Sequence, residues 1–231
     1  MRGVTDAYVG GFWWNTMLGE LGMSGHAFAC RQSLVGGAYP LIDLARRQPL
    51  PDFYSTLLWH RLAGSRALRL SVQRTYGKAT PEREAITYYA RCARWESKYS
   101  THAYGGTSSR PTEGGVLVVA LNLMSKSARF IVEGVGGSKG RRLDFVLTAG
   151  PGHQNSTAAM LMQQVHFNGA ELRVWENRTY AGIPSLVPQL TAGSAVRLPR
   201  WSYGFFLWPD AKVGACASAK TRAKWKAQAT A

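Results

Sequence analysis

The chain has 231 residues, of which 45% are hydrophobic, so it is long and apolar enough to bury a core and is not intrinsically disordered. Its formal charge of +15 favours polyanionic partners such as sulfated glycans, nucleic acid or anionic lipid, although a solvated basic surface without a dedicated ligand explains the charge equally well. No apolar run approaches the roughly 20 residues of a membrane-spanning helix, and the opening MRGVTDAYVGGFWW lacks the pattern of a signal peptide.

The first predicted element is a helix that Thr5 and Asp6 are suited to cap. Its expected buried face, at a spacing near 3.6 residues, consists of Val9, Phe12, Trp13, Met17 and Leu21. The adjacent Trp13 and Trp14 are candidates for a sugar-binding platform, but aromatic residues on a helix of this period more often belong to the core.

A strand, a turn and a second helix follow. The apolar run at residues 27–30 predicts a short buried parallel strand, and a glycine turn then leads to Tyr39. The sequence Pro49-Leu50-Pro51-Asp52 predicts a helix start with Asp52 as the cap, and Gly64 ends that helix. This order is typical of the last units of a βα repeat, which cannot close a barrel alone, so the chain is expected to begin inside a domain.

From residue 67 onward the hydrophobic period changes to two, which indicates half-buried strands. Strands are predicted at residues 68–72, 86–90, 116–123, 128–132, 143–147, 160–167, 171–175, 195–198 and 203–208. Asn168-Gly169 is the strongest hairpin signal among the turns. Closely spaced strands of this kind are typical of an antiparallel β-sandwich.

Other segments argue against several kinds of site. The glycine loop at residues 134–140 lacks the Gly-Lys-Ser/Thr order of a phosphate loop and lies between strands. Cys30, Cys92 and Cys216 are compatible with one disulfide and one thiol or with three thiols; no CxxC spacing or suitably placed His occurs, so we expect no metal site, and no cofactor. The basic residues 218–231 are expected to form a disordered tail.

A series of short motifs along the chain is more specific as an ordered set than any one of its members. The motifs are Gly11-Phe12-Trp13, Cys30-Arg31-Gln32, Gly36-Gly37 with Tyr39, Pro49-Leu50-Pro51-Asp52-Phe53-Tyr54, Ala120-Leu121-Asn122-Leu123, Phe167-Asn168-Gly169, Ser202-Tyr203 and Lys212-Val213. In this order they resemble the C-terminal half of the heparanase family, the endo-β-glucuronidases of glycoside hydrolase family 79. The resemblance covers roughly residues 5 to 217.

The resemblance implies α/β plus all-β architecture, with the last units of a (β/α)8 TIM barrel followed by an antiparallel β-sandwich. Residues 1–64 would then be the C-terminal portion of the barrel, residues 65–217 the sandwich and residues 218–231 the basic tail. It also implies that Gln32, Gly36, Gly37 and Tyr39 bind substrate in a cleft at the end of the last barrel strand, where barrel sites lie. A buried polar network is the alternative role for Gln32.

The resemblance places both catalytic glutamates of a retaining glycosidase on earlier barrel strands. Such enzymes need two carboxyl groups about 5 Å apart, one as acid and one as nucleophile. None of Asp6, Glu20, Asp43 and Asp52 matches them, so no catalytic residue is expected and the chain alone is predicted to be inactive. It would be an incomplete gene model, a split subunit that needs the N-terminal barrel portion, or a degenerate protein.

The resemblance further implies a disulfide between Cys92 and Cys216, with Cys30 as a buried thiol. It implies an acidic glycan partner, such as heparan sulfate or a glucuronide-bearing proteoglycan, and a secreted, membrane-associated extracellular, lysosomal or vacuolar location. Asn155 and Asn177 lie in glycosylation sequons that matter only there. The alternatives are a non-catalytic binding module for anionic polysaccharide and a basic nucleic-acid-binding protein, for which no recognised motif is present.

Overall fold

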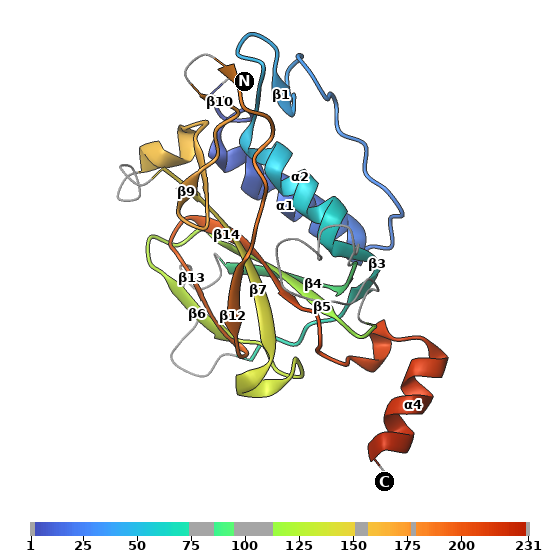
Figure 1. The fold of residues 1–231 in the computed structure, drawn as a ribbon. Coiled ribbons are helices and arrows are strands. Elements are labelled where there is room, and N and C mark those ends of the chain that lie inside the picture. Colours follow the sequence, from blue (N-terminus) through green and yellow to red (C-terminus); the bar gives the residue numbers. More distant parts are fainter. Residues whose placement is uncertain (1–2, 74–85, 95–112, 151–156, 177–178, 230–231) are drawn as a thin grey trace.

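The computed structural model describes residues 3–73, 86–94, 113–150, 157–176 and 179–229, and it consists of one large antiparallel sheet with helices on one face and a small second sheet on the other (Figure 1). The helices are α1 (Tyr8–Met23), α2 (Pro51–Leu62) and α4 (Ala219–Ala229). Short 3-10 turns are η2 (Gly137–Lys139), η4 (Thr157–Leu161) and η5 (Gly214–Cys216).

The large sheet has the strand order β3-β4-β5-β14-β7-β8-β9, with β12 also paired to β7. Its strands are β3 (Ala63–Leu68), β4 (Ile86–Ala93), β5 (Val116–Asn122), β7 (Arg141–Ala149), β8 (Val165–Phe167), β9 (Ala170–Glu171), β12 (Gln189–Ala192) and β14 (Ser202–Trp208). The predicted Asn168-Gly169 hairpin is confirmed, because it joins β8 to β9 with both residues at positive φ. The antiparallel, mostly sheet character expected after residue 67 is therefore confirmed.

Three smaller pairs complete the strands of the described chain. They are β6 (Ala128–Ile131) with β13 (Ala195–Leu198), β1 (Ile42–Asp43) with β2 (Gln48–Pro49), and β10 (Trp175–Glu176) with β11 (Thr179–Tyr180). The β6–β13 pair packs on the face of the large sheet opposite to the helices, through residues such as Val196 and Leu198.

The central strands β5 and β14 are buried on both faces, and this explains their continuous apolar runs. On β5, Leu117, Val119 and Leu121 belong to the core cluster that contains α1 and α2. The alternate residues Val116 and Val118 belong to the cluster under β6 and β13. The period of two along a strand thus divides the interior into two cores.

Two glycine residues allow α1 to approach the sheet closely, beside the buried rings of Tyr8 and Phe12. A Cβ on Gly11 would overlap the Tyr203 ring, and a Cβ on Gly19 would overlap the Tyr89 ring. The predicted buried face of this helix was partly wrong, because Trp13 and Met17 are exposed whereas Asn15 is buried. Counting apolar residues misses a close approach that only small residues permit.

The second helix begins at Pro51, as predicted, and runs into β3 without a linker. Figure 1 shows α1 and α2 lying side by side over the sheet. Their residues, including Phe12 and Leu58, share a core with β5, β7 and β14. The division at residue 64 and the barrel assignment of the first segment stay predictions.

Several predictions about local structure were wrong. Residues 27–30 contain no strand, and Cys30 is exposed instead of buried, because the described chain offers no neighbouring strands with which a parallel strand could pair. Only Leu68 of the predicted strand 68–72 is in a strand. Residues 160–161 lie in a 3-10 turn and residues 162–164 are irregular, so only Val165–Phe167 of the predicted strand 160–167 forms β8. The predicted strand 171–175 is interrupted by the irregular residues 172–174. The tail expected to be disordered contains helix α4, consistent with its Ala, Lys, Arg and Gln content.

Candidate functional site

A closed loop connects the end of α1 to the start of α2 and carries most of the predicted site residues. It is held by hydrogen bonds from the Ile42 N–H to the Leu34 carbonyl at 2.9 Å and from the Leu50 N–H to the Leu41 carbonyl at 2.8 Å. Gly36 and Gly37 have φ of 66° and 89°, which side chains rarely tolerate, and the Ser33 hydroxyl donates to the Gly36 carbonyl. The glycine pair is therefore a conformational requirement of this turn.

Two exposed aromatic rings and one arginine lie together where this loop meets α1. The Trp13 and Tyr39 rings are 6.4 Å apart and are 49% and 40% exposed. The Arg31 guanidinium lies 5.3 Å from the Trp13 ring and 4.7 Å from the Trp14 ring, within the range of cation–π attraction, and its Nε donates to the Tyr39 carbonyl at 3.3 Å. We call Trp13, Trp14, Arg31 and Tyr39 the aromatic cluster.

Arg31 of the aromatic cluster forms a buried ion pair with Asp52. The two side chains are 6% and 1% exposed, and Nη2 of Arg31 donates to Oδ2 of Asp52. Burial raises the pKa of Asp52 to about 6, because loss of hydration outweighs the attraction of Arg31. The predicted capping role of Asp52 was wrong, since Leu50 is the N-cap residue and no side chain caps this helix.

The predicted substrate-binding residues Gln32, Gly36, Gly37 and Tyr39 all lie on this loop. Gln32 is exposed and makes no hydrogen bond within the described chain, which overturns the alternative of a buried polar network. Of the four, Tyr39 belongs to the aromatic cluster, where its ring lies 6.4 Å from that of Trp13. Their role in binding stays a prediction.

Each remaining carboxylate of this segment has a hydrogen-bond donor. Asp6 accepts from Nε2 of Gln163 at 2.9 Å, Glu20 from the Tyr89 hydroxyl at 2.8 Å and Asp43 from the Arg46 N–H at 2.7 Å. These hydrogen bonds connect Asp6 to Gln163 and Glu20 of α1 to Tyr89 of β4, and the bond of Asp43 lies within the loop.

The structure contains the disulfide between Cys92 and Cys216, which the resemblance implies. It joins β4 to η5 across a sequence separation of 124 residues, with the Cα atoms 5.2 Å apart. The sequon residues Asn155 and Asn177 lie outside the described residues. Within the described ranges, no His, Cys, Asp or Glu cluster is arranged to hold a metal ion, and no helix has the length and apolar character to cross a membrane.

Sequence reasoning missed Arg31 and Asp52 as partners and underrated Trp13. A helix advances by 100° per residue, so two adjacent tryptophans cannot both point to the same core. Trp14 is buried, and its Nε1 donates to the Thr56 hydroxyl at 2.7 Å, whereas Trp13 faces outward. The adjacency of Trp13 and Trp14 in one helix was therefore enough to predict that one of them faces outward. Nothing in the spacing of Arg31 and Asp52 predicts their contact.

The chain is similar to heparanase from Mus musculus, with 30% identity over 215 residues that cover 92% of this chain and 35% of that protein. The chain belongs to the heparanase-like family. It corresponds to the C-terminal part of such a protein and spans little more than a third of the length of the relatives it matches. No protein-family model matches it.

Other members of this family come from distant organisms. Heparanase-like protein 1 of Arabidopsis thaliana is 28% identical and is matched over 93% of this chain and 39% of its own length. Hyaluronoglucuronidase of the leech Hirudo nipponia is 27% identical over 93% of this chain and 38% of its own length. Similarity thus extends across both the loop-bearing segment and the sheet of this heparanase-like chain.

Among solved structures, a glycoside hydrolase family 30 xylanase from Clostridium acetobutylicum is 12% identical, with a TM-score of 0.30 over 74% of this chain and 31% of that one. A TM-score of this size carries no argument about the fold.

Proposed function

We propose that this chain is the C-terminal part of a retaining glycoside hydrolase that cleaves β-glucuronide bonds in acidic glycans such as heparan sulfate. The observation that carries the proposal is the similarity to heparanase over 92% of the chain. Two further relatives are named hyaluronoglucuronidase and baicalin-β-D-glucuronidase. Both names refer to cleavage of a glucuronide, which supports a glucuronide bond as the bond cleaved.

The loop next to the aromatic cluster would contribute to a sugar-binding cleft. Trp13 and Tyr39 offer exposed ring faces, which suit the apolar faces of sugar rings. Within the described chain, neither the Gln32 side chain nor the Gly37 N–H has a hydrogen-bond partner, so both are available to sugar hydroxyl or carboxylate groups. Gly36 and Gly37 also keep the backbone free of side chains at this point.

The chain would not hydrolyse glycosidic bonds by itself. A retaining mechanism needs two carboxyl groups about 5 Å apart, one able to protonate the leaving oxygen. Asp6, Glu20 and Asp43 accept hydrogen bonds within the fold, and Asp52 pairs with a buried arginine. We therefore assign acid and nucleophile to residues outside this chain, on the remaining barrel portion.

An exposed apolar face supports a contact with that barrel portion. It includes Met17, Leu34 and Leu44, all on α1 or the loop that follows it. A chain of this family with such a face would associate through it. Family membership and the disulfide together support an extracellular or lysosomal location, where oxidising conditions preserve disulfides.

Hydrolysis of a chromogenic β-glucuronide and of heparan sulfate by the purified 231-residue chain tests the proposal, with circular dichroism as the check on folding. We expect no turnover above background. Turnover by the folded chain would overturn the assignment of acid and nucleophile to residues outside it, and Asp6, Glu20, Asp43 and Asp52 would then be substituted in turn.

A further inference from the structure

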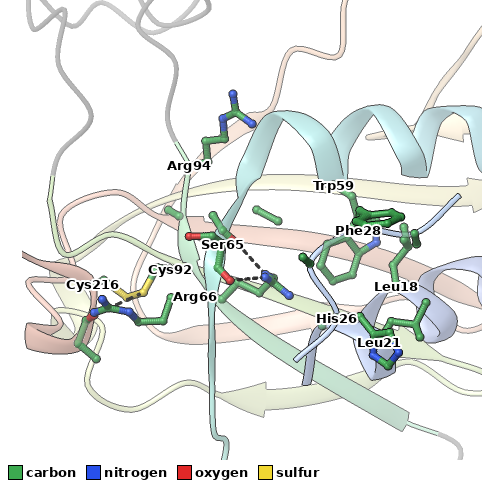
Figure 2. Close-up of a pocket in the computed structure, with 18 of the residues that line it drawn as sticks. Leu18, Leu21, His26, Phe28, Trp59, Ser65, Arg66, Cys92, Arg94 and Cys216 are labelled. Carbon is green, nitrogen blue, oxygen red and sulfur yellow. Dashed lines mark hydrogen bonds between the residues drawn. A yellow bond between two sulfur atoms is a disulfide. The ribbon is translucent and has the colours of Figure 1, made fainter. Parts of the chain in front are cut away.

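A hollow at the C-terminal end of α1 is lined by basic side chains. It has a volume of about 950 Å³ and lies between the C-terminal end of α1, the segment that follows it, and strands β3 and β4. Arg66, Arg91, Arg94 and His26 line it, and none of the lining residues that the structure describes is Asp or Glu. Figure 2 shows Arg66 beside the Cys92–Cys216 disulfide at one end of the hollow, with Phe28 and Trp59 at the other.

Arg91 is the best-placed cation in this hollow. Its Nε donates to the Gly64 carbonyl at 2.8 Å and its Nη2 donates to the Ser65 carbonyl at 2.7 Å, which fixes the guanidinium on β4. No carboxylate in the described chain pairs with it, and burial lowers its pKa without an opposing charge. A guanidinium has five N–H groups, so these two bonds leave about three donors for a ligand.

Arg66 adds a second fixed cation from the neighbouring strand β3. Its Nη1 donates to the Ala215 carbonyl, next to the disulfide. The acidic residue at this end, Glu113, accepts the Ser218 N–H at 2.8 Å at the start of α4 and does not line the hollow. Each of these two anchored guanidinium groups is a favourable place for an anionic group, and no Asp or Glu among the described lining residues competes for it.

The opposite end of the hollow is apolar. Leu18 and Leu21 of α1 line it together with Trp59 and with Phe28, which is 80% exposed. A ligand that fills the hollow therefore presents both an anionic group and an apolar surface. An acidic saccharide has this combination, since its rings carry C–H faces beside sulfate or carboxylate groups.

We propose that this hollow is a second glycan site, in which Arg91 and Arg66 bind sulfate or carboxylate groups of an acidic saccharide and the apolar end contacts its sugar rings. The choice of a saccharide rests on the proposed function, whereas the preference for an anion follows from the lining residues alone. The site would hold a glycan chain at a distance from the bond that is cleaved.

Gly22 allows a test that leaves the net charge unchanged. It lies in α1 beside Arg91, and a Cβ at this position would overlap Nη1 of that guanidinium. Gly22→Ala therefore displaces Arg91 while favouring the helix. Arg66→Ala removes the second cation, and Arg129→Ala, at an exposed position on β6, is the control with the same change in charge.

Binding of a heparin-derived hexasaccharide to the 231-residue chain is measured by calorimetry, alongside a hyaluronan hexasaccharide and an oligonucleotide of matched charge. We expect Gly22→Ala and Arg66→Ala each to weaken binding of the heparin fragment about tenfold, the effect of losing one charge-assisted hydrogen bond, and Arg129→Ala to weaken it less than about twofold. Hyaluronan carries carboxylate groups but no sulfate, so its binding would show that the hollow accepts a carboxylate. A preference for heparin would show that the hollow binds a sulfate group.

Three outcomes would overturn the proposal. They are unchanged binding in both pocket variants with a retained dichroism spectrum, equal losses in Arg129→Ala, and oligonucleotide binding that is as tight and as sensitive to Gly22→Ala as that of the glycan. Arg66→Ala keeps the test decisive if Gly22→Ala does not fold. Because binding is measured without hydrolysis, failure of the proposed enzymatic function would leave these results unaffected.

Discussion

Arg31 and Asp52 form a buried ion pair in which each partner keeps one polar atom without a hydrogen bond, Nη1 of Arg31 and Oδ1 of Asp52. The pair joins the predicted sugar-binding loop to the first turn of α2. It also places the Arg31 guanidinium within cation–π distance of the rings of Trp13 and Trp14. Burying the two charges with incomplete hydrogen bonding costs desolvation free energy. We therefore expect the pair to fix the geometry of the loop more than it stabilises the fold.

We predict a pH dependence of stability that originates in Asp52. Its pKa in the folded state, about 6, lies above the value of about 3.9 in an unfolded chain. The folded state therefore binds a proton more tightly, and the stabilisation is fully present below about pH 4 and is lost as pH rises through 6. Urea unfolding between pH 4 and 7 measures it, and an equal slope in Asp52→Asn would contradict the assignment.

Removing the arginine partner should be more harmful at neutral than at acidic pH. Arg31→Leu leaves a buried carboxylate without a counter-ion, and we expect a loss of about 3 to 5 kcal/mol at pH 7. Near pH 4.5 the carboxyl group accepts a proton at little cost, so the loss should be smaller. Equal losses at the two pH values in urea unfolding would show that Arg31 acts mainly through packing.

Trp13 is predicted to matter for binding and little for folding. Trp13→Ala should weaken binding of a glucuronide disaccharide about three- to tenfold, as expected for one stacked ring, because half of this side chain faces solvent next to Tyr39. Tyr180→Ala, at an exposed ring of β11 outside the aromatic cluster, is the control. NMR titration of both variants measures the effect, and similar losses in the two would remove the aromatic cluster from the binding site.

Much of the sheet could be predicted from sequence, because β5 and β14 are mostly apolar runs of strand length and β13 alternates between exposed and buried residues. The small second sheet and the order of strands depend on contacts between distant segments, which local patterns do not encode. For the site, the motif order predicted Gln32, Gly36, Gly37 and Tyr39, and their role in binding stays a prediction. The contacts of Arg31 with Trp13 and Asp52 follow only from how α1 and α2 pack together.

Gly19 should not tolerate a side chain, whereas Gly22 on the same helix should tolerate one. A Cβ on Gly19 would overlap the ring of Tyr89, a buried residue of β4. Gly19→Ala is therefore expected to destabilise the fold by about 1 to 2 kcal/mol, although Ala has the better helix propensity. At Gly22 the obstacle is the end of the Arg91 side chain, which can rotate away. Thermal unfolding of the two variants compares them, and equal stability would mean that α1 is not held at this distance by Tyr89.

The Cys92–Cys216 disulfide should contribute strongly to stability. It closes a loop with a separation of 124 residues, for which the chain-entropy model gives about 4 to 5 kcal/mol. We expect Cys92→Ser with Cys216→Ser to lower the free energy of unfolding by this order, and Cys30→Ser to leave it nearly unchanged because Cys30 is exposed and unbonded. Urea unfolding with and without reductant measures both, and a loss below 1 kcal/mol in the double variant would indicate a denatured state that is already compact.

Two arginines face each other across the small sheet, and their repulsion can be relieved by one substitution. Arg129 on β6 lies directly opposite Arg197 on β13, and both are exposed. Like charges at such positions destabilise a strand pair, so Arg129→Glu should raise the free energy of unfolding by about 0.5 to 1 kcal/mol at low salt, and by less at 1 M salt because the charges are then screened. Arg129→Ala removes the repulsion without adding attraction and should fall between the wild type and Arg129→Glu. If Arg129→Glu instead destabilises the fold at low salt, the aliphatic part of the Arg129 side chain contributes more through packing than its charge costs.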